Sequence, residues 1–245
     1  MAISNQTIKD HYDNLLGPIY SWTLGDFKAK SEVFRTFLTS NDIKPFGNKI
    51  AIDLGAGNGL QSIPLAEVGF DVIAIDLNRH LLKELQVNAT GRNISVLNAD
   101  MRDVEKFAQE PELIICAGDT ISHLSDKSEV KKFITKISKR LVKGGKAIFS
   151  FRDYSNEVIG QERFILVKSS EERILTCVLD YEDEAVIVTD LLYEKFGKNW
   201  KQKASTYRKV RIIPKEVVGY LELNQMRLTF NGKVDGLTTI IAIKQ

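Results

Sequence analysis

Between residues 50 and 151 the sequence alternates short apolar runs with longer amphipathic segments, and this alternation constrains the fold more than any other feature. The apolar runs are residues 50–52, 72–75, 94–97, 113–116 and 147–151. The segments between them, which we expect to be helices, are residues 60–68, 78–89, 103–109 and 127–142. Runs this short and rich in β-branched residues are typical of strands buried on both faces of a parallel sheet. Because strand–helix–strand crossovers are right-handed, the sequence predicts an α/β fold with a doubly wound, mostly parallel sheet.

After residue 155 the pattern changes to a succession of strands that alternate apolar and polar side chains, as in an antiparallel meander with one face in water. These strands are expected at residues 164–168, 173–179, 185–193 and 205–213. A final helix and two strands are expected at residues 214–224, 226–230 and 237–243. The predicted parts are therefore an N-terminal helical segment (1–44), an α/β core (45–155 and 213–245) and an antiparallel β insertion (156–212).

The composition favours a water-soluble globular chain without a strongly charged partner surface. Of the 245 residues, 43% are hydrophobic and 27% are charged, and 34 basic residues nearly balance 32 acidic ones. No net field therefore favours nucleic acid or a membrane as a partner, and no apolar stretch approaches the roughly 20 residues of a spanning helix. Because the N-terminus lacks an apolar signal segment, we expect a cytoplasmic protein. We expect it to be a monomer or a homodimer.

The two cysteines, Cys116 and Cys177, are too few for a disulfide framework and lack the spacing of metal ligands. Both lie in apolar runs, so we expect buried free thiols. The sequence therefore gives no reason to expect disulfide or metal chemistry.

A glycine-rich turn follows the first predicted strand, and its residues are Asp53-Leu54-Gly55-Ala56-Gly57-Asn58-Gly59. Glycines let the backbone turn tightly and let a ligand approach it closely. The dinucleotide fingerprint G-x-G-x-x-G requires a third glycine where Leu60 stands. An anionic Asp53 would also be unfavourable beside a pyrophosphate, whereas it suits a ligand that carries an ammonium group. The turn therefore disfavours an NAD(P)-dependent oxidoreductase.

Two further acidic residues follow the next two strands. Asp76 ends the second strand, roughly 20 residues after the turn, where a carboxylate can hold two ribose hydroxyls. Asp100 follows the third strand, where it can accept a hydrogen bond from an adenine amino group while Met101 contacts the ring. Strand-end aspartates can also simply cap the helices that follow. Their shared register with the glycine turn nevertheless favours a ligand site at the carboxyl edge of the sheet.

With these residues the chain resembles the class I S-adenosylmethionine-dependent methyltransferases, whose motif of an acid, any residue and G-x-G-x-G is matched from Asp53 to Gly59. The resemblance covers roughly residues 45–155 and the final helix and strand pair. It implies a seven-stranded Rossmann-like sheet with its last strand antiparallel, and S-adenosylmethionine as the cofactor. The cofactor-binding residues that it implies are Tyr12, Tyr20, Asp53, Gly55, Ala56, Gly57, Asp76, Leu77, Asp100, Met101 and Gly118. The aromatic residues Tyr12 and Tyr20 could instead anchor the N-terminal segment on the sheet.

The segment from Cys116 to Leu124 is the loop that flanks the methyl group and the acceptor in similar enzymes. It lacks the N-P-P-Y type of motif that accompanies methylation of nucleic-acid bases, and it is most similar to the loop of small methyltransferases. Asp119 is a candidate for orienting the acceptor and His123 for accepting a proton, with an N-cap and a packed imidazole as the alternatives. Tyr207 is the third catalytic candidate.

The acceptor-binding residues that we predict are Trp22, Arg152, Tyr154 and Arg208. Arg152 could bind an anionic acceptor through two parallel hydrogen bonds, or it could pair with Asp153. Strand alternation places Tyr207, Lys209 and Arg211 on one face, which we interpret as a solvated face. The insertion is expected to form a lid over the acceptor, as insertions at this point do in similar enzymes.

The sequence therefore predicts an enzyme that transfers the methyl group of S-adenosylmethionine to a small-molecule acceptor by direct in-line displacement. A sulfonium-bound methyl group is already activated, so positioning and exclusion of water are the main tasks of such a protein. The main alternative is a protein that binds S-adenosylmethionine without turnover, and an NAD(P)-dependent oxidoreductase is a weaker one. A nucleic-acid methyltransferase is disfavoured by the balanced charge.

Overall fold

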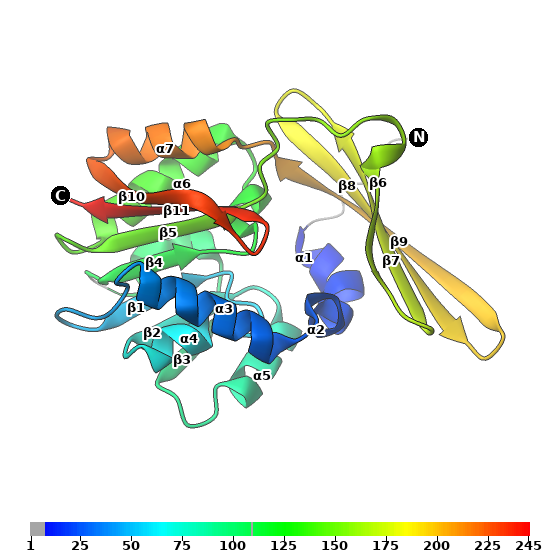
Figure 1. The fold of residues 1–245 in the computed structure, drawn as a ribbon, viewed down its shortest axis with the longest axis horizontal. Coiled ribbons are helices and arrows are strands. Elements are labelled where there is room, and N and C mark those ends of the chain that lie inside the picture. The colour runs from blue at the N-terminus through cyan, green and yellow to red at the C-terminus, as the bar shows by residue number, and fades with distance from the viewer. Residues whose placement is uncertain (1–7, 109) are drawn as a thin grey trace.

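The chain folds around a seven-stranded core sheet, seen in a computed structural model that describes residues 8–108 and 110–245 (Figure 1). Residues 1–7 of the expected N-terminal segment and residue 109 of an expected helix lie outside this description. The strands in their order across the sheet are β10 (Met226–Val234), β11 (Leu237–Lys244), β5 (Lys146–Phe151), β4 (Leu113–Cys116), β1 (Ile50–Leu54), β2 (Asp71–Asp76) and β3 (Ile94–Asn98). β11 runs antiparallel to both of its neighbours, while the pairs from β5 to β3 are parallel. This confirms the predicted fold class, including the antiparallel last strand.

Helices cover both faces of the core sheet and bury it. α3 (Phe27–Ser40), α4 (Ser62–Glu67) and α5 (Arg79–Asn88) pack on one face, and α6 (Lys127–Arg140) and α7 (Pro214–Leu223) pack on the other. Side-chain caps begin three of these helices: Asp26, Asn78 and Asp126 accept hydrogen bonds from backbone N–H groups of α3, α5 and α6. The segment expected as a helix at 103–109 is instead a short 3₁₀ helix, η3 (Met101–Lys106).

A second, four-stranded antiparallel sheet, here called the insertion sheet, follows β5 after the short 3₁₀ helix η5 (Gly160–Arg163). Its strands pair in chain order: β6 (Phe164–Ser169), β7 (Arg173–Tyr181), β8 (Ala185–Phe196) and β9 (Asn199–Val210). β9 begins six residues earlier than expected, at Asn199 rather than at 205, and ends at Val210 rather than at 213. Residues 199–204 are all exposed, so they carry no apolar alternation that could have revealed a strand.

The described N-terminal segment, residues 8–24, lies between the two sheets (Figure 1). It consists of α1 (Ile8–His11), a π-helical turn η1 (Tyr12–Leu16), a 3₁₀ turn η2 (Gly17–Ile19) and α2 (Tyr20–Leu24). Leu15 and Ile19 pack against Leu175 and Leu192 of the insertion sheet. The segment therefore joins the insertion sheet to the core through an apolar contact. The division of the chain into three parts stays our proposal.

Some sequence expectations are modified by burial. Cys116 and Cys177 are both free, but only Cys116 is fully buried, whereas Cys177 is half-buried.

No helix in the described part of the chain has both the length and the apolar character that crossing a bilayer requires.

Phe149 offers a test of the core, because it lies near the centre of the sheet on β5 and is 1% exposed. We expect Phe149→Ala to lower the free energy of unfolding by about 3–5 kcal/mol, since it removes a buried ring and leaves a cavity. Urea denaturation followed by circular dichroism measures this change. Phe164→Ala is the matched control because Phe164 is 59% exposed on β6, and an equal loss in both variants would contradict the assigned core.

Candidate active site

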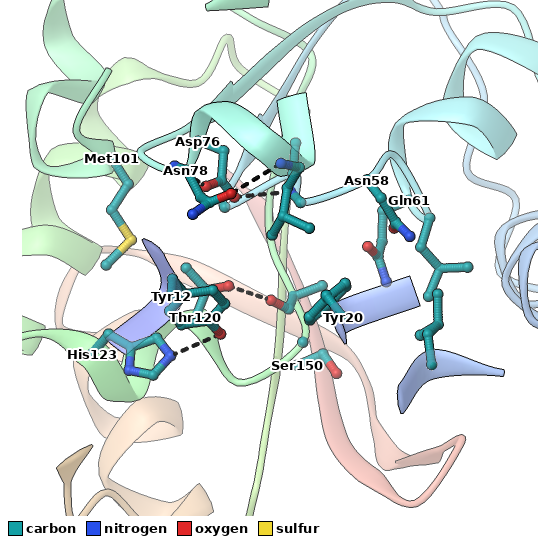
Figure 2. Close-up of a pocket in the computed structure, with 18 of the residues that line it drawn as sticks. Tyr12, Tyr20, Asn58, Gln61, Asp76, Asn78, Met101, Thr120, His123 and Ser150 are labelled. Atoms are coloured by element: carbon teal, nitrogen blue, oxygen red, sulfur yellow. Dashed lines mark hydrogen bonds between the residues drawn. The ribbon is translucent and has the colours of Figure 1, made fainter. Parts of the chain in front are cut away.

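A cavity of about 670 Å³ opens at the carboxyl edge of the core sheet, where the parallel strands end (Figure 2). This volume lies within the roughly 300–1,000 Å³ of small-molecule sites. Its walls come from the glycine turn, the ends of β2 and β5, the loop after β4, the N-terminal segment and the β10–β11 hairpin. Parallel strands place their carboxyl ends at one edge, which is why segments distant in sequence meet here.

The glycine turn after β1 is held by backbone hydrogen bonds to the neighbouring strand β2. The N–H groups of Gly55 and Ala56 donate to the carbonyl of Ile75 at 2.8 and 2.9 Å. Gly55 has a φ of 78°, and a Cβ added there would meet the side chain of Thr120 at 2.4 Å. Glycine is therefore required at this position both by backbone conformation and by the close approach of the loop after β4.

Asp76 closes the turn from the other side and lines the cavity. Its two carboxylate oxygens accept hydrogen bonds from the N–H groups of Gly57, at 2.9 Å, and of Asn78, at 2.7 Å. Burial raises the pKa of this carboxyl above its ordinary value. Each oxygen keeps capacity to accept a further hydrogen bond, so Asp76 can hold ligand hydroxyl groups.

Asp53 occupies a different place from the one that the sequence suggested. It is 1% exposed, is not among the described residues that line the cavity, and accepts a hydrogen bond from the Ser62 hydroxyl at 2.6 Å. Burial raises its pKa to about 7. The carboxyl therefore joins the end of β1 to the start of α4 and lies off the cavity wall.

Three residues that the sequence assigned to the cofactor also line the cavity: Leu77, Asp100 and Met101. The Asp100 carboxylate caps η3 by accepting from the Arg102 N–H at 2.9 Å, and it also forms an ion pair with the Arg102 side chain at 2.6 Å. Arg102 therefore competes for the carboxylate that the sequence assigned to an adenine amino group.

The N-terminal segment covers the cavity with two aromatic side chains, Tyr12 and Tyr20 (Figure 2). The Tyr12 hydroxyl lies 3.4 Å from Nε2 of His123, and its ring meets the imidazole edge-on. Asp13 accepts a hydrogen bond from the side-chain amide of Asn78 at 2.8 Å, which ties the segment to the core. Burial raises the pKa of Tyr20 to about 12, so its hydroxyl stays protonated and can donate.

Of the three catalytic candidates, His123 lines the cavity, whereas Asp119 and Tyr207 lie behind its walls. Burial, reinforced by the charge of Lys209, lowers the pKa of His123 to about 3. The imidazole is therefore neutral near pH 7 and is a weak general base, because an efficient base has a pKa near the working pH. Tyr207 is 8% exposed and stacks on His11 with 4.0 Å between ring centroids.

Asp119 forms a buried ion pair with Lys209 that the sequence did not predict. The two side-chain atoms lie 2.5 Å apart. Burial is the largest single influence and raises the pKa of Asp119, but the charge and hydrogen bond of Lys209, together with His123 and the Arg152 N–H, hold the pKa below its ordinary value. Tyr207 and Lys209 do share one face of β9, yet this face is buried and not solvated, because the N-terminal segment and the loop after β4 pack on it.

The four acceptor candidates separate into one cavity residue and three that lie elsewhere. Arg152 lines the cavity, and its guanidinium forms no ion pair with any described residue; Asp153 instead accepts from the Ser155 N–H. The other three are held outside the cavity wall: Trp22 packs against the insertion sheet, Tyr154 is 3% exposed, and Arg208 donates to the carbonyl of Ser125.

Several cavity residues were missed by sequence reasoning: Asn58, Gln61, Thr120, Ser150, Lys30 and Asp235. Asn58 stands inside the glycine motif, so its position could have revealed it. Lys30 and Asp235 form an ion pair between α3 and the β10–β11 hairpin, and no local pattern marks either residue. Their contribution depends on contacts between segments about 200 positions apart, as the two residue numbers show.

The cavity fits an adenosyl cofactor that carries an amino-acid group. Oδ1 of Asn58 and Nδ1 of His123 are buried and have no hydrogen-bond partner among the described residues, and both residues line the cavity. At Gly118, which has a φ of 68°, an added Cβ would meet nothing within 4 Å, so the backbone there borders open space. These groups leave hydrogen-bonding capacity for a polar ligand and room for its close approach.

The buried carboxyl of Asp53 predicts a pH dependence of stability. Its folded pKa of about 7 lies above the ordinary value of 3.8, so the folded chain holds a proton that the unfolded chain has lost between these values. Stability from this group is therefore lost as pH rises. We expect the wild-type chain to lose on the order of 3 kcal/mol more than Asp53→Asn between about pH 5 and pH 8, measured by urea unfolding. Parallel losses in the two chains would contradict this assignment.

Comparison with known proteins finds a methyltransferase domain in part of the chain. Residues 51–145 match a family model described as a methyltransferase domain. Glycine/sarcosine N-methyltransferase from Aphanothece halophytica is 30% identical over 151 residues, which cover 59% of this chain and 57% of that protein. Glycine N-methyltransferase from Oryctolagus cuniculus is 22% identical over 258 aligned positions, which cover 95% of this chain and 86% of that protein. The chain thus spans little more than half the length of the first of these relatives.

Solved structures agree with the fold. An S-adenosylmethionine-dependent methyltransferase from Clostridium acetobutylicum has a TM-score of 0.72 at 19% identity, covering 95% of this chain and 96% of that one. A structure of an amino pentose methyltransferase from Micromonospora echinaspora with bound cofactor has a TM-score of 0.74 at 12% identity, covering 95% of this chain and 97% of that one. Residues 51–145 thus match a methyltransferase domain, and the strand order agrees with a fold that S-adenosylmethionine-dependent methyltransferases share.

Proposed function

We propose that the chain methylates a small amine that carries an acidic group, by direct in-line transfer. The observation that carries this proposal is the presence, in one cavity, of the glycine turn with Asp76 and of the unpaired Arg152. The relatives named for glycine and sarcosine N-methylation support an amine bearing a carboxylate as the acceptor. A guanidinium is suited to such a group because its planar donors match the two carboxylate oxygens.

The residues that would hold the cofactor follow from its chemistry. Asp76 can accept hydrogen bonds from the ribose hydroxyls, while Leu77 and Met101 supply apolar surface to the adenine. The unpaired Oδ1 of Asn58 suits the ammonium of the methionine part. Tyr12 and Tyr20 cover this end of the cavity, and aromatic faces attract a cationic sulfonium.

When bound, S-adenosylmethionine supplies a methyl group that its sulfonium has already activated. The chain's own residues are then needed for positioning and for excluding water. The N-terminal segment serves the second of these tasks, since it covers the cavity with the half-buried side chains of Tyr12 and Tyr20. No residue needs to act as a general base if the amine arrives neutral, which agrees with the low pKa of His123.

Asp76 provides the test of cofactor binding. We expect Asp76→Ala to weaken S-adenosylmethionine binding by at least about tenfold, because charge-assisted hydrogen bonds to ribose are lost. Asp71→Ala is the matched control, since Asp71 begins the same strand at its opposite end. Calorimetric titration with S-adenosylmethionine, S-adenosylhomocysteine and NADH measures the effect. Binding of NADH alone, or equal weakening in both variants, would overturn the assignment.

Arg152 provides the test of the acceptor. We expect Arg152→Gln to raise the KM for glycine or another acidic amine by at least about tenfold, with S-adenosylmethionine affinity kept. The same variant should leave the KM for the corresponding amide, such as glycinamide, almost unchanged. Arg163→Gln, on the exposed turn before β6, is the control.

Methyl transfer to these amines is measured as the formation of S-adenosylhomocysteine. A wild-type chain that binds the cofactor but methylates none of a panel of amines and amino acids would favour the non-catalytic alternative. A variant Arg152→Gln with an unchanged KM for acidic amines would remove Arg152 from the acceptor site.

A further inference from the structure

We propose that Lys209, on the insertion sheet, is a positioning residue for methyl transfer. Its ammonium neutralises Asp119 and thereby leaves the guanidinium of Arg152 available to the acceptor. The inference rests on the proposed function in one respect, namely that Arg152 binds the acceptor. It assigns a task to the insertion sheet that is independent of covering the cavity.

The first element of the argument is the ion pair itself. Nζ of Lys209 lies 2.5 Å from Oδ2 of Asp119, and the two side chains are only 10% and 6% exposed. Two charges removed from water in this way are stable only as a pair, because either one alone would keep its full desolvation cost. The pair therefore fixes the end of β9 against the loop after β4.

The second element is the backbone that Asp119 organises. Asp119 has a left-handed φ of 72°, its N–H donates to the carbonyl of Ser150, and its carbonyl accepts from the Ser122 hydroxyl. Its neighbours Gly118 and Thr120 line the cavity. The conformation of the cavity wall after β4 thus depends on a residue that the insertion sheet holds in place.

The third element connects the pair to Arg152. The backbone N–H of Arg152 donates to Oδ1 of Asp119 at 3.0 Å, so the main chain from which the Arg152 side chain extends lies at this carboxylate. With Lys209 present, the charge of Asp119 is already matched. Without Lys209, the Arg152 side chain, which starts from this main-chain contact, would be attracted to the unmatched carboxylate and so withdrawn from an anionic acceptor.

Other ionisable groups surround Asp119 and must be considered in any pH experiment. They are Cys116 on β4, His123 in the loop, Arg152 and Tyr154 after β5, Tyr12 in the N-terminal segment, and Tyr207 and Lys209 on β9. Burial raises the pKa of the Cys116 thiol and of the three tyrosines and lowers that of His123, so each of these five groups is neutral near pH 7. Of these residues, Lys209 and Arg152 are therefore the two that carry a positive charge near pH 7.

The experiment compares four variants of the 245-residue chain. Lys209→Met removes the ammonium and keeps most of the volume, and Asp119→Asn keeps an oxygen that can accept from the Arg152 N–H. The double variant removes both charges. Lys203→Met is the matched control, because Lys203 lies on the same strand and pairs with Glu194 at the surface, where such pairs contribute little.

We expect Lys209→Met to raise the KM for an acidic amine by at least about tenfold, with cofactor affinity and the KM for the matching amide changed by less than about threefold. The double variant should recover most of the loss, since it has no unmatched charge. In Lys209→Met the defect relative to wild type should shrink as pH falls, because the isolated Asp119 carboxyl becomes protonated. Lys203→Met should behave as wild type.

Hydrogen–deuterium exchange on the same proteins measures how well the backbone amides of the loop after β4 are protected, and it does not require turnover. We expect faster exchange at residues 117–124 and at the Arg152 amide in Lys209→Met, with protection restored in the double variant. If the wild-type chain methylates nothing, this measurement still decides the positioning role. If Lys209→Met does not fold, a folded double variant with a near wild-type KM supports the proposal, and one with a tenfold higher KM contradicts it.

Three results would overturn the proposal. The first is a KM for acidic amines in Lys209→Met that equals that of the Lys203→Met control. The second is a double variant whose increase in KM for acidic amines equals the product of the increases in the two single variants. The third is unchanged hydrogen exchange of the loop.

Discussion

The hydrogen bond from the Gly57 N–H to the Asp76 carboxylate, at 2.9 Å, is the interaction on which the site depends most. It joins the turn after β1 to the end of β2 and fixes the carboxylate at the cavity wall. The bond forms only because the two strands are parallel neighbours with Leu54 paired to Ile75, so both end at the same edge. A site assembled in this way needs no long side chain to reach across the sheet.

The remaining walls are added to this edge by segments that contact one another as well as the core. The N-terminal segment binds the core through Asp13 and Asn78, and it binds the insertion sheet through His11, whose Nδ1 lies 2.8 Å from the Ser205 hydroxyl. The insertion sheet in turn reaches the loop after β4 through Lys209. Three polar contacts thus connect the segments around the cavity, and the contacts of His11 with Ser205 and of Lys209 with Asp119 are buried.

Local patterns predicted the part of the molecule whose structure is determined locally. The strand and helix alternation indicated the core sheet, and the glycine motif with Asp76 and Met101 indicated which strand ends border the cavity. The errors have long-range causes. The sequence could not show that the inward face of β9 meets the N-terminal segment, which places Tyr207 behind the wall and turns Lys209 from an expected surface charge into a buried one.

Asp53 and Asp100 illustrate a second kind of limit, because a residue type does not reveal which group it forms a hydrogen bond or an ion pair with. Asp53 is occupied by Ser62, and Asp100 is shared with Arg102. Only the coordinates reveal these two pairings. The sequence does not show whether the Ser62 hydroxyl or the Arg102 guanidinium points toward the carboxylate or away from it.

The insertion sheet touches the cavity sparingly: among the described residues 164–210, Val167 alone lines it. The stretch that matches the methyltransferase family model, 51–145, ends before this sheet begins. Substitutions in the sheet can therefore accumulate without disturbing the cofactor edge, provided that its buried contacts are kept. The insertion sheet therefore influences the cavity mainly through buried contacts such as the Lys209–Asp119 pair, and only slightly as part of its wall.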